Sequence, residues 1–311
     1  MARDPQYADP QRYIELVGFE GGWRDLFWNR DFLAFTASRL GFDQVSEVLD
    51  VGCGAGHWGR ALLPHLPAHA QLVGVDREEA FFELAREQTD PSRTRFLAGT
   101  AEQLPFDDAS FDLVTCQTLL IHVADPAVAI AEMMRVLRPG GVLLAAEPDN
   151  RAGNLALLGG EPRPSNEDLL AIMELLLRSE TGKAALGEGD QSIGARLPGL
   201  FAAAGLHGVV AHTNDRCISL YPPYERPDML VAIEKEREWM RQDVSILCGS
   251  REDAWRFYEA AGGTPEAFDA GWAAVRRWMQ AVDAGIEAGT YHAARGFVMY
   301  LVAGWKPSSN G

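Results

Sequence analysis

The sequence is poor in cysteine and in long apolar runs. Its four cysteines stand neither in Cys-x-x-Cys pairs nor beside histidines at the spacing of a zinc site, so we expect free thiols in a reducing compartment and no bound metal. No apolar run approaches the ~18 residues that a membrane-spanning helix needs. The amino terminus shows neither the basic cluster nor the apolar stretch of a signal peptide. These absences predict a cytoplasmic protein without a membrane partner.

Basic side chains are also scarce. Lys and Arg number 28 against 44 Asp and Glu, which gives a formal net charge of −16. Such a field repels a phosphate backbone unless a local basic patch offsets it, and here the arginines are scattered and the lysines few. We therefore do not expect nucleic acid as a partner. A length of 311 residues with 47% hydrophobic content suits one catalytic domain with a substantial addition.

Short apolar strands alternate with helical stretches up to residue 150. The expected strands are residues 47–51, 72–76, 94–99, 111–117 and 142–147. Between the last two, apolar residues recur at helical spacing over residues 129–137, and Pro139-Gly140-Gly141 ends that helix. Strands that alternate with helices predict a parallel sheet with helices on both faces. The near-continuous apolar character of the strands agrees with burial on both faces.

The pattern changes after Asn150. Helices are expected near 166–182 and 192–204, a strand at 207–213, an almost wholly helical region at 228–288 and a last strand within 296–307. The last two strands are predicted to pair, with the helical region inserted between them. Residues 7–40 are expected to be helical and are rich in aromatic side chains. The predicted domains are a helical cap of residues 1–44, a core of residues 45–215 with 290–307, and a helical lid of residues 216–289 inserted before the last strand.

A glycine-rich loop follows the first strand. In VLDVGCGAGHWG, residues 48–59, Gly52, Gly54 and Gly56 stand between that strand and a helix. Glycine permits unusual dihedral angles and lets a ligand approach the backbone closely, and the loop presents N–H groups at a helix amino terminus. Such a loop alone is a weak signal. Asp76 strengthens it, because an acidic residue about 20 positions downstream accepts hydrogen bonds from ribose hydroxyls; capping of the next helix is the alternative role of Asp76.

Four successive motifs resemble those of one enzyme family. LDVGCGAG, VGVD, GTAEQLPFDDASFDLV and LRPGG follow one another between residues 45 and 150. They resemble the motifs of class I S-adenosylmethionine-dependent methyltransferases, above all the group of ubiquinone and menaquinone biosynthesis C-methyltransferases and many natural-product methyltransferases. The resemblance implies an α/β fold: a Rossmann-like, doubly wound, mostly parallel seven-stranded sheet, with N-terminal helices and a helical lid before the last strand. It also implies S-adenosyl-L-methionine as cofactor, S-adenosyl-L-homocysteine as product and a small-molecule acceptor.

The resemblance also implies how the first two motifs contact the cofactor. Gly52, Cys53 and Gly54 would wrap the methionine portion through backbone groups. Asp76 would hold the ribose, and Asp50 would brace the glycine loop.

Four further residues are implied as cofactor contacts. Arg77 would flank the adenine. Many relatives carry Asp at the position of Thr100, whose hydroxyl can still accept a hydrogen bond from the adenine amino group, while the Ala101 N–H would donate to a ring nitrogen. Gln117, at the end of the fourth strand, would lie beside the methionine group; a solvated strand terminus is its alternative role.

The chemistry itself requires few catalytic groups. Methyl transfer is an in-line displacement at a sulfonium carbon with a neutral leaving group, so proximity, orientation and exclusion of water matter most. A base is needed only where the acceptor must lose a proton. His122 is the first candidate, because loops at the carboxyl ends of strands line such sites and imidazole titrates near neutral pH. Glu147 is the second. A surface histidine and a structural hydrogen bond to a loop are their respective alternatives.

The nature of the acceptor is left open by the sequence. Trp239, Trp255, Trp272 and Trp278 lie in the predicted lid, and large apolar groups suit an apolar or aromatic acceptor, although helices need such residues simply to pack. Methylation of O, N or C uses the same cofactor half, and nothing indicates an oligomeric state. The alternatives are an S-adenosylmethionine-binding module without catalysis and an NAD-dependent oxidoreductase. The Gly-x-Gly-x-Gly spacing after Asp50 and the LPFDDASFDLV run disfavour the oxidoreductase.

Overall fold

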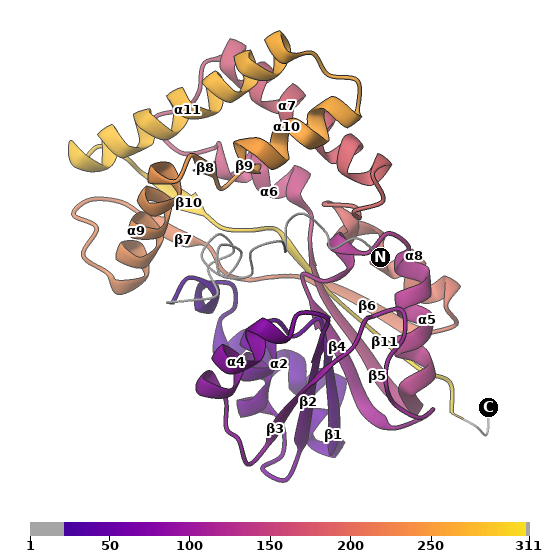
Figure 1. Cartoon of the computed structure of the whole chain (residues 1–311). Coiled ribbons are helices and arrows are strands. Elements are labelled where there is room, and N and C mark those ends of the chain that lie inside the picture. Colours follow the sequence, from indigo (N-terminus) through magenta and orange to yellow (C-terminus); the bar gives the residue numbers. More distant parts are fainter. Residues whose placement is uncertain (1–21, 309–311) are drawn as a thin grey trace. The chain divides into compact units, whose positions relative to one another are not determined.

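The computed structural model describes residues 22–308, which fall into two compact units. The sheet unit comprises residues 28–149, 192–215 and 299–308, and the helical unit comprises residues 22–27, 150–191 and 216–298. The chain therefore crosses repeatedly between the two (Figure 1). The division into a cap of residues 1–44, a core and a lid of residues 216–289 stays a prediction. Residues 150–191 belong to the same compact unit as the segment predicted to be the lid.

A seven-stranded sheet forms the centre of the sheet unit. Its strand order is β3-β2-β1-β4-β5-β11-β6 (Figure 1). The strands are β1 (Glu47–Val51), β2 (Gln71–Asp76), β3 (Thr94–Ala98), β4 (Phe111–Gln117), β5 (Leu137–Pro148), β6 (His207–Thr213) and β11 (Met299–Trp305). The first five are parallel, and β11 runs antiparallel to both β5 and β6. The predicted mostly parallel, doubly wound sheet of seven strands is thus confirmed, as is the pairing of its last two strands.

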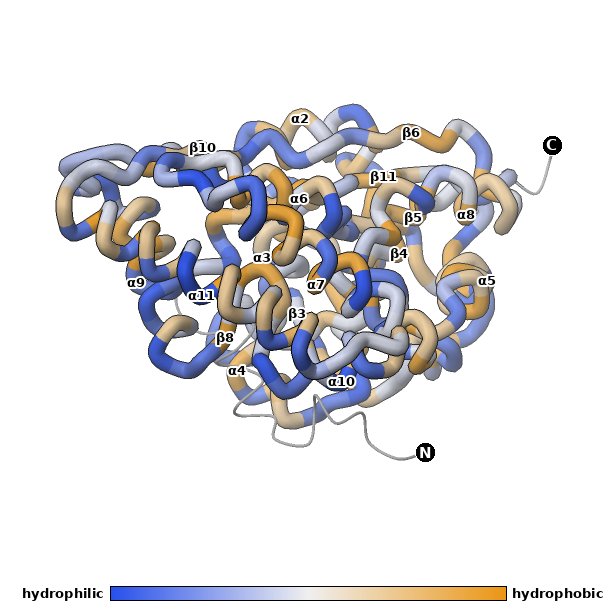
Figure 2. Tube along the Cα trace, turned by 90° about the horizontal axis from the view of Figure 1, so that it is seen from above, coloured by the Kyte–Doolittle hydropathy of each residue, from blue (hydrophilic) through white to orange (hydrophobic). Residues whose placement is uncertain are grey.

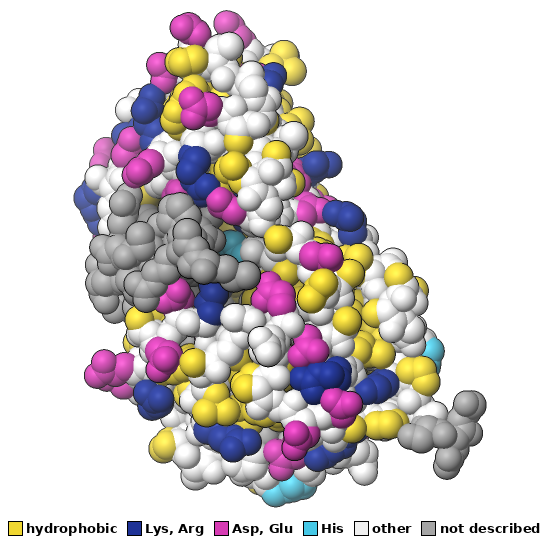
Figure 3. All heavy atoms as spheres, turned by 45° about the vertical axis from the view of Figure 1, so that its right-hand side comes forward, with side chains coloured by type: hydrophobic (Ala, Val, Ile, Leu, Met, Phe, Trp, Pro, Cys, Tyr) yellow, Lys and Arg dark blue, Asp and Glu magenta, His cyan; other side chains and the backbone are white. Residues whose placement is uncertain are grey.

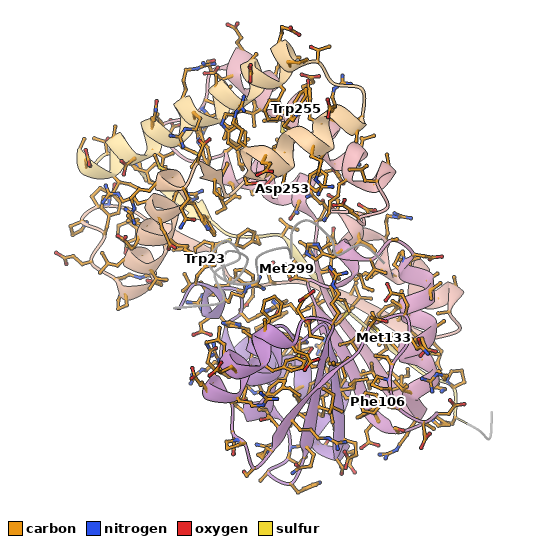
Figure 4. All side chains as sticks on the ribbon, in the orientation of Figure 1. Trp23, Phe106, Met133, Asp253, Trp255 and Met299 are labelled. Atoms are coloured by element: carbon orange, nitrogen blue, oxygen red, sulfur yellow. The ribbon has the colours of Figure 1, made fainter. Side chains whose placement is uncertain are left out.

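The helices of the sheet unit are short and amphipathic. They are α2 (Arg30–Leu40), α3 (His57–Leu62), α4 (Phe82–Gln88), α5 (Pro126–Val136) and α8 (Leu197–Ala203), with short 3-10 turns between them. In α5 the Asp125 side chain caps the helix by accepting the Ala127 N–H, and Pro126 occupies the first turn. Its buried residues include Met133, labelled in Figure 4, and its hydropathy alternates along the tube in Figure 2. This single apolar face explains why α5 packs on the sheet.

Five helices build the helical unit. They are α6 (Asn150–Leu157), α7 (Asn166–Ala185), α9 (Pro227–Arg241), α10 (Arg251–Ala260) and α11 (Pro265–Glu287), joined by the hairpin of β8 (Val244–Ser245) with β9 (Gly249–Ser250) and by the pair of β7 (Ile218–Leu220) with β10 (Ala293–Arg295). The predicted helical region 228–288 is thus three helices with a hairpin. Among residues 22–308, no helix is both long and apolar enough to cross a membrane.

The helical expectation for residues 7–40 is met in part. Residues 7–21 lie outside the described part of the chain. The following stretch contains only the short turn η2 (Arg24–Leu26), while α2 forms its last eleven residues.

The tryptophans of the helical unit lie in its core. Trp239, Trp272 and Trp278 are 4 to 6% exposed, and Trp255, labelled in Figure 4, meets Phe268 edge-on with ring centroids 5.1 Å apart. Neither Trp239 nor Trp272 lines the cavity of about 20 Å³ within this unit, whose walls include Asn150, Asn154, Glu180 and Gln191. The positions of these tryptophans favour packing over a role in an apolar acceptor pocket.

Contact between α7 and α10 depends on a glycine. A Cβ at Gly182 would overlap the carbonyl oxygen of Phe257, a backbone atom that cannot rotate away.

We expect Gly182→Ala to lower the free energy of unfolding by about 3 kcal/mol, measured by urea unfolding, because overpacking strains both helices. A Cβ added at Gly199 in α8 would have no atom within 4 Å. Gly199→Ala should therefore raise stability by about 0.5–1 kcal/mol. Equal effects of the two substitutions would contradict the described packing.

Candidate functional site

The carboxyl ends of β1 to β5 lie at one edge of the sheet, here called the carboxyl edge. In the strand register, Val51 of β1 lies opposite Val75 of β2 and Cys116 of β4, and Gln117 lies opposite Ala146. Because these strands are parallel, whatever follows each of them meets at this edge. The structure thereby brings the glycine loop, Asp76, Gln117, His122 and Glu147 together, although the strands that position them are up to 100 residues apart in sequence.

The glycine loop is fixed by hydrogen bonds to β2. The N–H groups of Gly52 and Cys53 donate to the Val75 carbonyl at 2.7 and 3.0 Å. The Gly54 N–H donates to Asp76 Oδ2 at 2.8 Å. These bonds hold consecutive backbone groups of the loop in one orientation, so the loop is ordered by its neighbour strand.

Glycine is required in this loop for conformational reasons. Gly52, Gly54 and Gly56 have φ of 70°, 48° and 77°, the left-handed region that residues with a Cβ rarely adopt. A Cβ at Gly52 would also lie 2.6 Å from Leu119 Cδ1, so the loop and the segment after β4 are in close contact. Cys53, between these glycines, is 6% exposed.

Asp76 braces the glycine loop with one oxygen and its own turn with the other. Its Oδ2 accepts the Gly54 N–H, and its Oδ1 accepts the Glu78 N–H at 3.0 Å. Burial raises the pKa of Asp76, and both backbone N–H groups oppose this rise. Each oxygen accepts one bond, which leaves a lone pair on each for a ligand hydroxyl. Glu78, not Asp76, occupies the N-cap position of the turn before α4, and its side chain makes no capping hydrogen bond.

Asp50 links β1 to the helix that follows the glycine loop. Its Oδ2 accepts the Gly59 N–H of α3 at 3.2 Å, while its Oδ1 is buried without a hydrogen-bond partner. The side chain is fully buried, and desolvation raises the pKa of Asp50 to about 8, with a smaller contribution from the charge of Asp76.

The residues assigned to the adenine lie after β2 and β3. Arg77 follows Asp76 directly and is exposed. Thr100 is exposed, and its carbonyl accepts the Gln103 N–H at 3.2 Å in a short turn. Ala101 is 7% exposed. Arg77 thus follows β2, the neighbour of β1, whereas Thr100 and Ala101 follow β3, which pairs with β2. The adenine contacts of the three residues stay predictions.

Glu147 is enclosed by the turn that follows β4. Its Oε1 accepts the N–H groups of Leu119 and Leu120 at 2.8 and 2.9 Å, and its Oε2 accepts that of Ile121 at 3.4 Å. The carboxylate is 0% exposed, and burial raises the pKa of Glu147 to about 7 against the lowering by these three N–H groups. His122 ends the same turn, η6 (Leu120–His122), and is partly exposed. Both candidate bases therefore belong to one local structure.

Thr118, the first residue after β4, has a strained backbone conformation. It has φ of 53°, an uncommon conformation for a β-branched residue, and its Oγ1 is buried without a hydrogen-bond partner. Strain of this kind concentrates at functional sites. Nothing in the sequence signals it, because Thr118 reads as an ordinary polar residue after a strand.

Comparison with known proteins agrees with this geometry. Residues 49–145 match the family model described as a methyltransferase domain. Demethylmenaquinone methyltransferase of Staphylococcus haemolyticus is 42% identical over 137 residues, which are 44% of this chain and 54% of that protein. The enzyme of the same name from Staphylococcus aureus is 38% identical over 109 residues, 35% of this chain and 45% of that protein. The chain spans about half the length of the curated relatives it matches.

Solved structures show the same fold at low sequence identity. Haemonchus contortus phosphoethanolamine N-methyltransferase 2, in complex with S-adenosyl-L-methionine, has a TM-score of 0.50 and 17% identity over 97% of this chain and 59% of its own. One chain of a Haloferax volcanii complex with the Trm112 methyltransferase activator has a TM-score of 0.51 and 20% identity over 99% of this chain and 100% of its own. Residues 49–145 are thus similar to a methyltransferase domain, and the solved structures share the fold of the chain.

The burial of Asp50 predicts a pH dependence of stability. The folded protein retains the Asp50 proton up to about pH 8, whereas the unfolded chain releases it near its ordinary pKa of 3.8. The stabilising contribution is therefore complete below about pH 4 and is lost as the pH rises to 8. We expect Asp50→Asn to flatten the decline in unfolding free energy between pH 5 and 9, measured by urea unfolding.

A matched control for this experiment is Asp112→Asn. Hydrogen bonds from Glu47, Ser46 and Arg138 lower the pKa of Asp112, so its contribution is lost only in acid. Its Asn variant should keep the wild-type slope between pH 5 and 9. Identical slopes in the wild type and in Asp50→Asn would show that Asp50 is ionised in the folded protein.

Proposed function

We propose that the protein transfers a methyl group from S-adenosyl-L-methionine to a small-molecule acceptor. The observation that carries this proposal is the fixed relation between the glycine loop and Asp76 at the carboxyl edge. Backbone N–H groups of a tight turn lie beside a carboxylate at the end of the next strand. Doubly wound sheets bind the ribose of adenosine with this arrangement. The match of residues 49–145 to a methyltransferase domain supports a methyl donor as the cofactor rather than a nicotinamide.

The residues present suit this cofactor. Both carboxylate oxygens of Asp76 retain a lone pair, so the two neighbouring ribose hydroxyls can donate to them. The glycines lack the side chains that would keep a ligand from the backbone. When bound, the cofactor supplies an electrophilic methyl group on a positively charged sulfur. The protein then has to orient the acceptor, exclude water and remove a proton where the acceptor carries one.

A small molecule is the acceptor that the charge distribution favours. With a net charge of −16, the protein repels polyanions. On the face seen in Figure 3, acidic and basic side chains are interspersed and no extended basic patch is visible. The relatives named demethylmenaquinone methyltransferase support a small organic acceptor as well. That likeness covers 44% of this chain or less, and a shared fold leaves the choice between O-, N- and C-methylation open.

His122 is the residue we propose as general base. It ends the turn η6 at the carboxyl edge, and its partly exposed side chain can meet an acceptor, in contrast to the enclosed carboxylate of Glu147. Imidazole can take a proton near neutral pH. Loss of a base lowers the rate of methyl transfer only for acceptors that must lose a proton. A lower rate in a His122 variant would therefore also show that the acceptor loses a proton.

Binding of the cofactor is the first test. We expect S-adenosyl-L-methionine and S-adenosyl-L-homocysteine to bind the wild type in isothermal titration calorimetry. Asp76→Ala should weaken both by about 10- to 100-fold, the effect of losing hydrogen bonds to a charged acceptor. Asp90→Ala is the control, because the Asp90 side chain is exposed and accepts its hydrogen bonds from Ser92 within its own turn. Absence of binding to the wild type, or binding of NADH instead, would contradict the proposal.

The role of His122 is tested by turnover. Transfer of a labelled methyl group to a panel of small hydroxylated, amino and quinol compounds identifies an acceptor. We expect His122→Ala to lower kcat by about 10²- to 10⁴-fold for an acceptor that loses a proton, with the Kd of S-adenosyl-L-homocysteine within about twofold of wild type. Addition of exogenous imidazole should restore part of the turnover of the variant, because a free imidazole can then take the proton in place of the missing side chain. Unchanged turnover would remove His122 as the base.

A further inference from the structure

The buried carboxylate of Glu147 holds the start of the segment that connects β4 to α5. Three consecutive N–H groups, those of Leu119, Leu120 and Ile121, point at the oxygens of Glu147. They are the first N–H groups of a helical turn, which have no acceptor within the turn itself. The Cys116 thiol, 3.7 Å from Oε1, provides a further contact from β4. Glu147 thus satisfies a helix start that no nearby side chain caps.

The strand β5 also fixes the residue before this turn. The Thr118 N–H donates to the carbonyl of Ala146 at 3.0 Å, one residue before Glu147. Thr118 is held in a left-handed conformation, which a β-branched residue keeps only when its surroundings impose it. Ala146 holds Thr118 itself, and Glu147 holds the next residue, Leu119. The end of β5 therefore dictates the path of the chain after β4.

The anchored turn is in direct contact with the glycine loop. Leu119 donates its N–H to Glu147, and its side chain lies against Gly52, where an added Cβ would meet Leu119 Cβ and Cγ at 3.1 Å. A shift of Leu119 would therefore open a gap beside the loop. Glu147 thus connects through Leu119 to Gly52, whose backbone we expect to contact the methionine portion of the cofactor.

We propose that Glu147 is a positioning residue that holds the turn of residues 119–122, supports the glycine loop through Leu119 and sets the position of His122. This inference rests on the proposed function and differs from the prediction that Glu147 is itself a base. A carboxylate that is 0% exposed, with both oxygens engaged by backbone N–H groups, has no surface on which to meet an acceptor. Its role is to act through Leu119 and His122.

The test compares two substitutions. Glu147→Gln keeps one oxygen that can accept the Leu119 and Leu120 N–H groups, whereas Glu147→Met keeps the approximate volume and removes every acceptor. In amide hydrogen exchange followed by mass spectrometry, Glu147→Met should speed exchange at residues 119–121 by about 100-fold and at residues 52–54 by about 10-fold. The Kd of S-adenosyl-L-homocysteine should rise about 10-fold. Glu147→Gln should show smaller changes in all three measurements.

Asp112→Asn is the matched control. Asp112 accepts two backbone N–H groups, those of Ser46 and Glu47, at the opposite end of the same sheet. Its variant should speed exchange at residues 46–47 and leave both residues 52–54 and the Kd within about twofold of wild type. A similar effect of all three substitutions on the Kd would reduce Glu147 to a general contributor to stability and overturn the proposal.

Turnover separates positioning from base catalysis. An amide cannot take a proton, so if Glu147 were the base, Glu147→Gln would be as inactive as Glu147→Met. Positioning predicts instead that Glu147→Gln retains at least about a tenth of the wild-type kcat while Glu147→Met loses most of it. Equal inactivity, or exchange at residues 52–54 that stays at the wild-type rate in Glu147→Met, overturns the inference. The exchange measurements need no ligand, so they test the positioning role of Glu147 even if the cofactor does not bind. Failure of the proposed function would appear separately, as absent cofactor binding to the wild type.

Discussion

Hydrogen bonds from backbone N–H groups to buried carboxylates hold the carboxyl edge of this sheet. Asp50 accepts from α3, Asp76 from the glycine loop and Glu147 from the turn after β4. Each carboxylate stands at or near the end of a strand, and each binds a segment that turns away from the sheet. Tight turns leave backbone N–H groups without partners within the turn. Burial of such a group without a hydrogen-bond acceptor costs free energy. The carboxylates supply the missing acceptors, so the loops around the site are ordered by the strands beneath them.

Burial of three carboxylates at one edge has an electrostatic cost. Desolvation raises the pKa of each, to about 8 for Asp50 and about 7 for Glu147. The backbone N–H groups lower this cost, and they do so most for Glu147, which accepts three. Asp50 accepts one and keeps an oxygen without a partner, which agrees with its higher pKa. The number of N–H groups that each carboxylate accepts therefore bears on its protonation near neutral pH.

The helical unit is stabilised in a different way. Its core consists of apolar and aromatic side chains from helices distant in sequence, and α7 contacts both α10 and α11. A close approach at Gly182 fixes the packing of α7 on α10. Because its tryptophans serve this core, they do not identify an acceptor. The polar groups that could act on a ligand converge instead in the sheet unit.

Local patterns in the sequence are enough to predict the strands and the glycine loop with Asp76 after it. Apolar runs and glycine positions are local patterns, and the strands expected at 47–51, 111–117 and 207–213 coincide with β1, β4 and β6. Tertiary structure alone decided the surroundings of Glu147, because its acceptor bonds join segments 26 to 28 residues apart. It also decided the strain at Thr118 and the grouping of residues 150–191 with 216–298. Such contacts depend on which surfaces meet after folding, and periodicity along the chain carries no record of them.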